Sequence, residues 1–162
     1  MREEEAEERA GMSASWQVVE YAVVRGYLYF PGGDEITEAA EEEILRDGKL
    51  HPAVMNKEGV KLSPEQVKRL LDAVRPSKTS RKGVGCYFPH HGFVFYDQAG
   101  KPVAELSPCF LCGVGRAEPG NKSLTTWRFE ELAKLVTELK LPVFKDMKEA
   151  ESYYREKVAP KP

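Results

Sequence analysis

All three cysteines of the chain and two of its three histidines lie in one stretch, residues 85–113 (GCYFPHHGFVFYDQAGKPVAELSPCFLCG). Thiolate sulfur and imidazole nitrogen are ligands that structural zinc prefers, and thiolates are also nucleophiles and redox groups. Four kinds of site therefore compete for this stretch: a metal centre, a redox-active cysteine pair, a Cys-His catalytic centre, and buried thiols without reactivity. The residues concerned are Cys86, His90, His91, Cys109 and Cys112.

A β-hairpin is predicted to position these residues. The apolar runs Phe93–Tyr96 and Pro102–Leu106 flank the segment Asp97–Lys101, which opens with an aspartate and has Gly100 near its end. An aspartate at the start and a glycine near the end are typical of a four- or five-residue hairpin loop. The sequence therefore predicts a hairpin over about residues 92–107.

The register of this hairpin bears on the cysteines. If Tyr96 or Asp97 pairs with Lys101, the ladder of paired residues extends away from the turn towards the cysteines. Opposed side chains in such a ladder lie about 4.5–5.5 Å apart. All three cysteines are then expected at the base of the hairpin. Proline disrupts a ladder, so that end is expected to be distorted. The prolines are Pro89 and Pro108, and the predicted pairs are Cys86 with Leu111 or Cys112 and Cys109 with Phe88 or Pro89.

A zinc site is the leading interpretation. Cys109, Cys112 and Gly113 form a C-x-x-C-G sequence, in which the glycine permits the turn that directs both sulfur atoms inward. Cys86 and one histidine would complete the Cys3His set that structural zinc accepts. The two adjacent histidines point to opposite faces of an extended segment, so only one joins the site readily. The other is expected at the surface or in a hydrogen bond.

Thiol chemistry is an alternative. Cys86 could form a cross-strand disulfide with Cys109 or Cys112, or the latter two could form a reversible C-x-x-C pair. A redox C-x-x-C usually precedes a helix whose dipole lowers the thiol pKa, whereas here Gly113-Val114-Gly115 follows. This sequence is a poor start for a helix.

The remaining interpretations are a catalytic dyad and an inert core. Cys109 or Cys86 activated by His91 would need an orienting group and an oxyanion motif, and the sequence contains neither. Asp97 and Glu105 are interpreted as a turn residue and part of a solvated face. Cysteine is also among the most buried residue types, so the thiols could simply pack on the nearby aromatic side chains. Those are Tyr87, Phe88, Phe93, Phe95 and Phe110.

The rest of the chain predicts strands and helices around the hairpin. Residues 16–30 are rich in Val, Tyr and Phe and predict a bent strand or two strands, broken at Gly26. Ser63-Pro64-Glu65-Gln66 has the form of a capping box and starts a helix that ends near Arg75-Pro76. His51 is interpreted as a lone loop residue. Three further helices are expected: Glu35–Asp47, which is closed by Gly48; Thr125 or Thr126 to about Lys140; and about Asp146–Lys157. The second of these is expected to direct four side chains inward, namely Leu132, Leu135, Val136 and Leu139. Residues 117–122 are expected to form a loop.

Composition limits the functional classes. The chain has 162 residues, 41% hydrophobic and 31% charged, with a net charge of -2. This balance is typical of one globular domain and gives no basic face for nucleic acid. No apolar run approaches the length of a membrane helix. Residues 1–15 are predicted as a flexible acidic tail before a single domain at 16–158. The tail differs from a secretory signal, so a cytoplasmic location is expected, or an exported one if a signal has been lost.

The stretch CYFPHHGFVFYDQAGKPVAELSPCFLC resembles a pattern found in small bacterial proteins of unassigned function. They share C-x-x-P, a basic residue before His-Gly, an F-Y-D hairpin and a C-F-x-C; the helix LSPEQVKRLLDAV is a weaker match. The resemblance implies no activity, but it favours His91 over His90. Transferred to this chain, the motif comprises Cys86, Pro89, His91, Gly92, Phe95, Asp97, Gly100, Cys109, Phe110 and Cys112.

The sequence thus predicts a single-domain α+β fold, in which three or four helices pack on an antiparallel sheet containing the central hairpin. The leading hypothesis is a small binding or accessory protein with a structural zinc ion held by Cys86, His91, Cys109 and Cys112, and without catalytic residues. A thiol redox or metal-dependent enzyme is the first alternative. A partner-binding protein of the inhibitor or immunity type, with cysteines only in its core, is the second.

Overall fold

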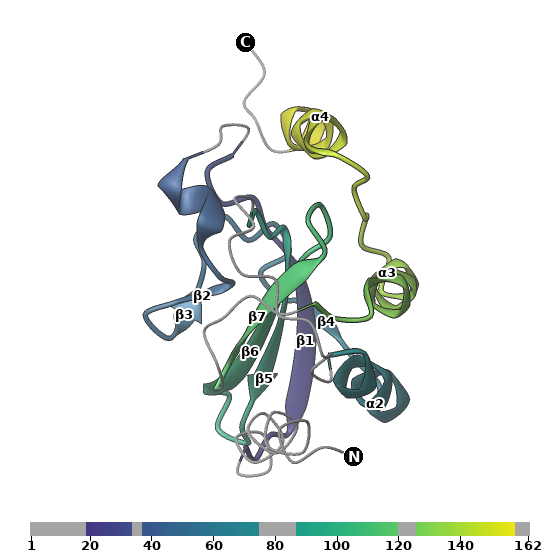
Figure 1. The fold of residues 1–162 in the computed structure, drawn as a ribbon. Helices are drawn as coiled ribbons and strands as arrows, with labels where there is room; N and C mark the ends of the chain where they lie inside the picture. Colours follow the sequence, from purple (N-terminus) through teal and green to yellow (C-terminus); the bar gives the residue numbers. More distant parts are fainter. Residues whose placement is uncertain (1–18, 34–36, 75–86, 120–125, 158–162) are drawn as a thin grey trace, which may run out of the picture.

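The computed structural model of the chain describes residues 19–33, 37–74, 87–119 and 126–157. Its centre is a five-stranded sheet in the order β4-β1-β5-β6-β7, in which every neighbouring pair is antiparallel (Figure 1). A second sheet pairs β2 with β3. The strands are β1 (Val23–Leu28), β2 (Leu45–Arg46), β3 (Lys49–Leu50), β4 (Val60–Lys61), β5 (His91–Tyr96), β6 (Pro102–Cys109) and β7 (Val114–Glu118).

The helices complete a mixed α+β fold, as predicted. In Figure 1, α2 and α3 lie on one side of the large sheet and the β2–β3 sheet lies on the other, while α4 lies beyond one end of the strands. The helices are the 3-10 helix η1 (Glu38–Glu41) and the α-helices α2 (Pro64–Ala73), α3 (Phe129–Glu138) and α4 (Met147–Lys157).

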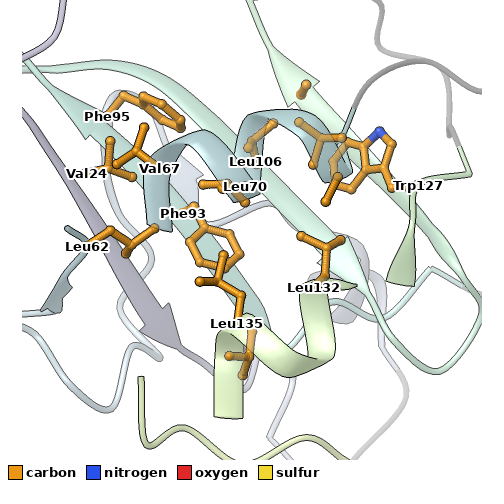
Figure 2. Packing of buried hydrophobic residues seen from close by; sticks show 14 of the residues in the cluster. Val24, Leu62, Val67, Leu70, Phe93, Phe95, Leu106, Trp127, Leu132 and Leu135 are labelled. Atoms are coloured by element: carbon orange, nitrogen blue, oxygen red, sulfur yellow. The ribbon is translucent and has the colours of Figure 1, made fainter. Parts of the chain in front are cut away.

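The main core fills the space between the sheet and the two helices α2 and α3 (Figure 2). Alternate side chains of a strand point to opposite faces, so β1, β5 and β6 each supply residues to this layer. The inward residues predicted for α3 are all buried. The side chains labelled in Figure 2 are Val24, Leu62, Val67, Leu70, Phe93, Phe95, Leu106, Trp127, Leu132 and Leu135.

The opposite face of the sheet is covered by residues 42–54, which we call the cover segment. Its Ile44 is fully buried and packs in a cluster with Tyr27, Tyr29, Val54 and Val94. The close approach of the cover segment to β5 depends on Gly92, because a Cβ atom at that position would lie 2.4 Å from Ile44 Cβ. The cover segment therefore gives the sheet a second buried face next to β6.

The predicted hairpin is confirmed as β5 and β6. One of the two predicted registers, with Asp97 opposite Lys101, is present beside the turn, where Tyr96 pairs with Pro102. The pairing shifts between Phe95 and Tyr96, so from Phe95 to Phe93, which pairs with Leu106, the ladder departs from that register by one residue. The turn forms as predicted, because Asp97 Oδ1 accepts the N–H groups of Ala99 and Lys101, each at 2.9 Å.

The capping box of α2 is confirmed. The Gln66 N–H donates to Ser63 Oγ at 3.2 Å, and the Ser63 N–H donates to Gln66 Oε1 at 2.9 Å. The last predicted helix is also present as α4, in which Ala150 is buried. The start predicted for α3 at Thr125 or Thr126 is wrong, since Arg128 is the N-cap residue.

The helix predicted over Glu35–Asp47 is wrong. Its described part contains the short η1 and then β2, the first strand of the β2–β3 hairpin. Asp47 and Gly48 have positive φ values of 51° and 74°, and Asp-Gly is a strong signal for a tight hairpin turn. This turn signal outweighs the helical spacing of the apolar residues before it.

Other expectations are corrected in part or lie outside the described residues. Strand β7 includes Ala117 and Glu118, which were expected in a loop. Strand β1 is shorter than the predicted run at 16–30. The acidic tail at 1–15 and Cys86 lie outside the described residues. None of the described helices is long and apolar enough to cross a membrane.

Candidate functional site

Residues 109–113, which we call the cysteine turn, connect β6, which ends at Cys109, to β7, which begins at Val114. Gly113 has a φ of 68°, in the left-handed region that favours glycine, and its N–H donates to the Cys109 carbonyl at 2.9 Å. This tight turn brings the Sγ atoms of Cys109 and Cys112 to 2.7 Å from each other. The C-x-x-C-G sequence therefore folds as predicted, with both sulfur atoms on one side.

The Cys109 thiol is fully buried and is surrounded by hydrogen-bond donors. Cys112 donates to its sulfur, and the backbone amides of Phe88, Cys112 and Leu111 also bond to it. The Cys112 bond is the largest influence, and together these contacts lower the pKa of the Cys109 thiol to about 7 although burial raises it. Cys109 therefore has substantial thiolate character at neutral pH, which is the form that binds metal and attacks disulfides.

The sequence predicted His91 as a ligand, and the structure places its ring in an aromatic pocket. Its centroid lies 4.9 Å from that of Phe110 and 6.1 Å from that of Phe144. Its Nε2 atom lies 2.6 Å from the carbonyl oxygen of Pro142. Burial lowers the pKa of His91 to about 4, so the ring is neutral at pH 7 and its Nε2 carries the proton donated to Pro142.

The described residues contain no group of three or more His, Cys, Asp or Glu side chains arranged to hold a metal ion. Of the predicted ligands, only Cys109 and Cys112 are brought together there. His91 does not join the two sulfur atoms in such a group, and Cys86 lies outside the described residues, directly before Tyr87. Tyr87 itself packs against Cys109 and Val114.

His90 is hydrogen-bonded, which is one of the two environments expected for the histidine outside the zinc site. Its ring packs between Phe30 and Phe144, with centroids 5.1 and 5.8 Å away, and it bonds to the Phe88 backbone carbonyl. Burial lowers its pKa to about 4. Phe88 thus bonds to Cys109 through its N–H and to His90 through its carbonyl.

His51 lies in a loop, as predicted, but the interpretation of it as a lone residue is wrong. His51 is buried, its Nδ1 accepts the Ala53 N–H at 3.0 Å, and its Nε2 lies 2.8 Å from Glu42 Oε2. Sequence reasoning missed this pair because it assigned Glu42 to a helix. No local motif around His51 signals the contact.

Glu105 is also placed differently from the expectation. It was assigned to a solvated face, yet it is only 4% exposed. Burial is the main reason that its pKa rises to about 8, and the negative charge of Glu43 adds to this rise. The alternation of β6 offered a signal, because Glu105 shares a face with Ser107 and Cys109, which are both buried.

The structure also has a groove of about 580 Å³ between β1, β4 and α2. Its lining is mainly apolar and includes no cysteine or histidine. The lining residues are Tyr21, Ala22, Val23, Val24, Lys61, Leu62, Pro64, Val67, Lys68, Leu71 and Asp72.

Comparison with known proteins gives no relative: no family model, no curated protein and no solved structure matches the chain. The geometry of the cysteine turn is therefore the principal evidence about function.

Proposed function

We propose that this chain is a small binding or accessory protein with a structural zinc ion at the base of its hairpin. Cys109 and Cys112 would supply two thiolates, and Cys86 and His91 would supply the other two ligands. The observation that carries the proposal is the tight turn at Gly113, which places the sulfur atoms of Cys109 and Cys112 on one side. Hydrogen bonds to Cys109 lower the pKa of its thiol to about 7 and so favour a thiolate, and structural zinc is bound by thiolates in closed, buried sites.

The chemistry of the donor set fits this ion. Gly113 allows the turn that presents both sulfur atoms, and the low pKa of Cys109 reduces the cost of deprotonation on binding. Zinc would cross-link the β6–β7 turn to the segment that precedes β5. This link would stabilise the fold, because such a site exists only in the folded chain.

His91 can take part only through Nδ1, because its Nε2 bonds to Pro142. This arrangement is compatible with metal binding, since a ligating histidine usually donates its other ring N–H to a carbonyl or carboxylate. The β5 end or the cysteine turn would have to rearrange to bring Nδ1 to the sulfur atoms, because His91 does not lie in one group with them here. Cys86 is one peptide bond from Tyr87, which packs against Cys109.

Burial favours a structural role over a catalytic one. Cys109 has no exposed surface, so a substrate cannot approach its sulfur without local opening. The described groove lies between β1, β4 and α2 and contains no thiol or imidazole. We therefore propose that the chain binds a protein partner and does not catalyse a reaction of a small molecule. The proposal includes neither nucleic-acid binding nor a membrane span.

Metal analysis of the purified protein tests this function. We expect one zinc ion per chain, removed by a strong chelator, together with thiols that react with a thiol reagent only after chelation. Cys109→Ser and Cys112→Ser should each abolish stoichiometric zinc, whereas Ser152→Ala on the exposed face of α4 should retain it. Zinc-free protein with unreactive thiols would contradict the proposal and leave the cysteines as core residues.

The short sulfur separation favours a second candidate, a reversible disulfide between Cys109 and Cys112. Two thiolates that each lie about 2.3 Å from one tetrahedral zinc ion stand about 3.8 Å apart, whereas these sulfur atoms are 2.7 Å apart. Oxidation would remove two electrons and two protons from the pair. The acceptor would be a small disulfide compound, which is reduced to two thiols. Reversible cycling of metal-free protein at a cytoplasmic potential would favour this candidate.

A further inference from the structure

The cover segment is fastened to the sheet by three side chains that bond to its backbone. Tyr29 donates its hydroxyl proton to the Glu42 carbonyl at 2.8 Å. Ser107 Oγ accepts the Ile44 N–H at 3.0 Å, and Glu105 Oε2 accepts the Leu45 N–H at 3.1 Å. Glu105 is the one member of this set that ionises near neutral pH, so it can make the attachment depend on pH.

Glu105 faces two other carboxylates. Glu118 is its cross-strand neighbour on β7, and Glu43 approaches it from the cover segment. The positive charge of Arg116 is directed elsewhere: its Nη1 lies 3.2 Å from Glu43 Oε1 and its guanidinium stacks 4.7 Å from the Tyr87 ring centroid. An ionised Glu105 would therefore be buried beside two other carboxylates, of which Glu43 is paired with Arg116.

The other titratable groups near this attachment do not offset that charge. Burial raises the pKa values of Tyr29 and Tyr87 well above 10, so both phenols are neutral. On the cover segment, Glu42 lies beside His51 at 2.8 Å and beside the exposed Arg46 at 3.9 Å, so these partners are directed to Glu42. The Leu45 N–H favours the ionised form of Glu105, but burial and the two carboxylates outweigh it and raise the pKa to about 8.

We propose that Glu105 is a pH-sensitive latch that holds the cover segment on the sheet in its neutral form and weakens that attachment as the carboxyl group ionises. Release of the segment would uncover the apolar face formed by Tyr27, Tyr29 and Val94. The latch uses Glu105, Glu43 and Glu118 and none of the proposed zinc ligands, so it is independent of the proposed zinc site.

The direction of the effect follows from proton linkage. In the closed state the pKa of Glu105 is about 8, and in the open state it returns to the ordinary value of about 4.3. Below both values the closed state has its full stability. As pH rises between them, the open state releases its proton first, so opening becomes up to about tenfold more favourable per pH unit. Above the higher value the effect is constant.

Hydrogen exchange measured by mass spectrometry tests the latch. Wild type and Glu105→Gln are compared at each pH between 5 and 9, so the intrinsic pH dependence of exchange cancels in their ratio. For a peptide covering residues 42–50, we expect wild type to exchange increasingly faster than the variant as pH rises to about 8, and the ratio then to level off. The Glu105→Gln substitution is chosen because the amide oxygen of glutamine can still accept the Leu45 N–H, which preserves the fold.

Two controls keep the result specific. Glu58→Gln changes an exposed carboxylate and should show no pH-dependent ratio. A peptide from α2, residues 64–73, should exchange equally in wild type and Glu105→Gln, since only the cover segment opens. A ratio for residues 42–50 that stays constant across this pH range would overturn the proposal. Parallel changes in both peptides would overturn it too, because they would indicate global unfolding.

Discussion

His91 Nε2 and the carbonyl oxygen of Pro142 are joined by a hydrogen bond of 2.6 Å. This bond links the first residue of β5 to the connection between α3 and α4, and it assigns the ring proton to Nε2. The Nδ1 atom is thereby the nitrogen that carries a lone pair. The bond therefore determines how this histidine can serve the proposed zinc site.

The adjacent histidines provide a matched test of the ligand set. We expect His91→Ala to lower zinc affinity by more than about tenfold, since loss of a ligand exceeds the usual effect of an outer-shell contact. His90→Ala should change zinc affinity much less. Competition with a chromophoric chelator measures both variants, and circular dichroism checks that they fold. A larger loss in His90→Ala would exclude His91 from the proposed ligand set.

Gly115→Ala should destabilise the fold by steric conflict. A Cβ atom at this position would lie 2.3 Å from Trp127 Cζ3, and overpacking of a core typically costs about 1–3 kcal/mol. Urea denaturation gives the change in free energy of unfolding. Gly100→Asn is the milder control: no atom lies within 4 Å of its Cβ position, and asparagine adopts a positive φ such as its 81° at less cost than most other residues. Equal stability of the two variants would contradict the packing of Trp127 on β7.

Ser107→Ala should leave the buried Ile44 N–H without its acceptor. The loss of a buried partner costs about 1–3 kcal/mol, and the bond is 3.0 Å long in a fully buried site. Thermal or urea unfolding measures this loss. Ser152→Ala on α4 removes an exposed hydroxyl and should change stability by less than about 0.5 kcal/mol. A neutral Ser107→Ala variant would mean that the cover segment is not held by this bond.

The capping box of α2 predicts a smaller effect. Ser63→Ala removes the acceptor of the Gln66 N–H and should cost about 1 kcal/mol in unfolding free energy. Ser63→Asp preserves an acceptor and should lie close to wild type. If both substitutions were equally destabilising, the side-chain cap would not explain the role of Ser63.

The sequence predicted those parts of the fold whose signals are local. The Ser63–Gln66 box and the Asp97 turn each satisfy backbone groups within four residues, and both are present. The helix predicted over Glu35–Asp47 failed because the Asp47-Gly48 turn and the contact of Ile44 with the sheet decide that segment. Tertiary contacts therefore override the helical spacing of apolar residues where an apolar side chain packs against a strand that is distant in sequence.

The candidate site was predicted only in part for the same reason. The turn of Cys109 to Gly113 follows from its own sequence. The burial of Glu105 and the contact between His51 and Glu42 depend on the cover segment, whose fold the sequence pattern did not predict. The bond from His91 to Pro142 likewise joins residues 51 positions apart. No local pattern encodes such contacts.

X-ray absorption spectroscopy at the zinc edge, on protein purified with its native metal, tests the central claim most directly. The account predicts one zinc ion per chain with about three sulfur neighbours at about 2.3 Å and one nitrogen neighbour at about 2.0–2.1 Å. Cys109→Ser and Cys112→Ser should lose this signal. Protein that holds no zinc, or zinc surrounded only by oxygen and nitrogen, would contradict it.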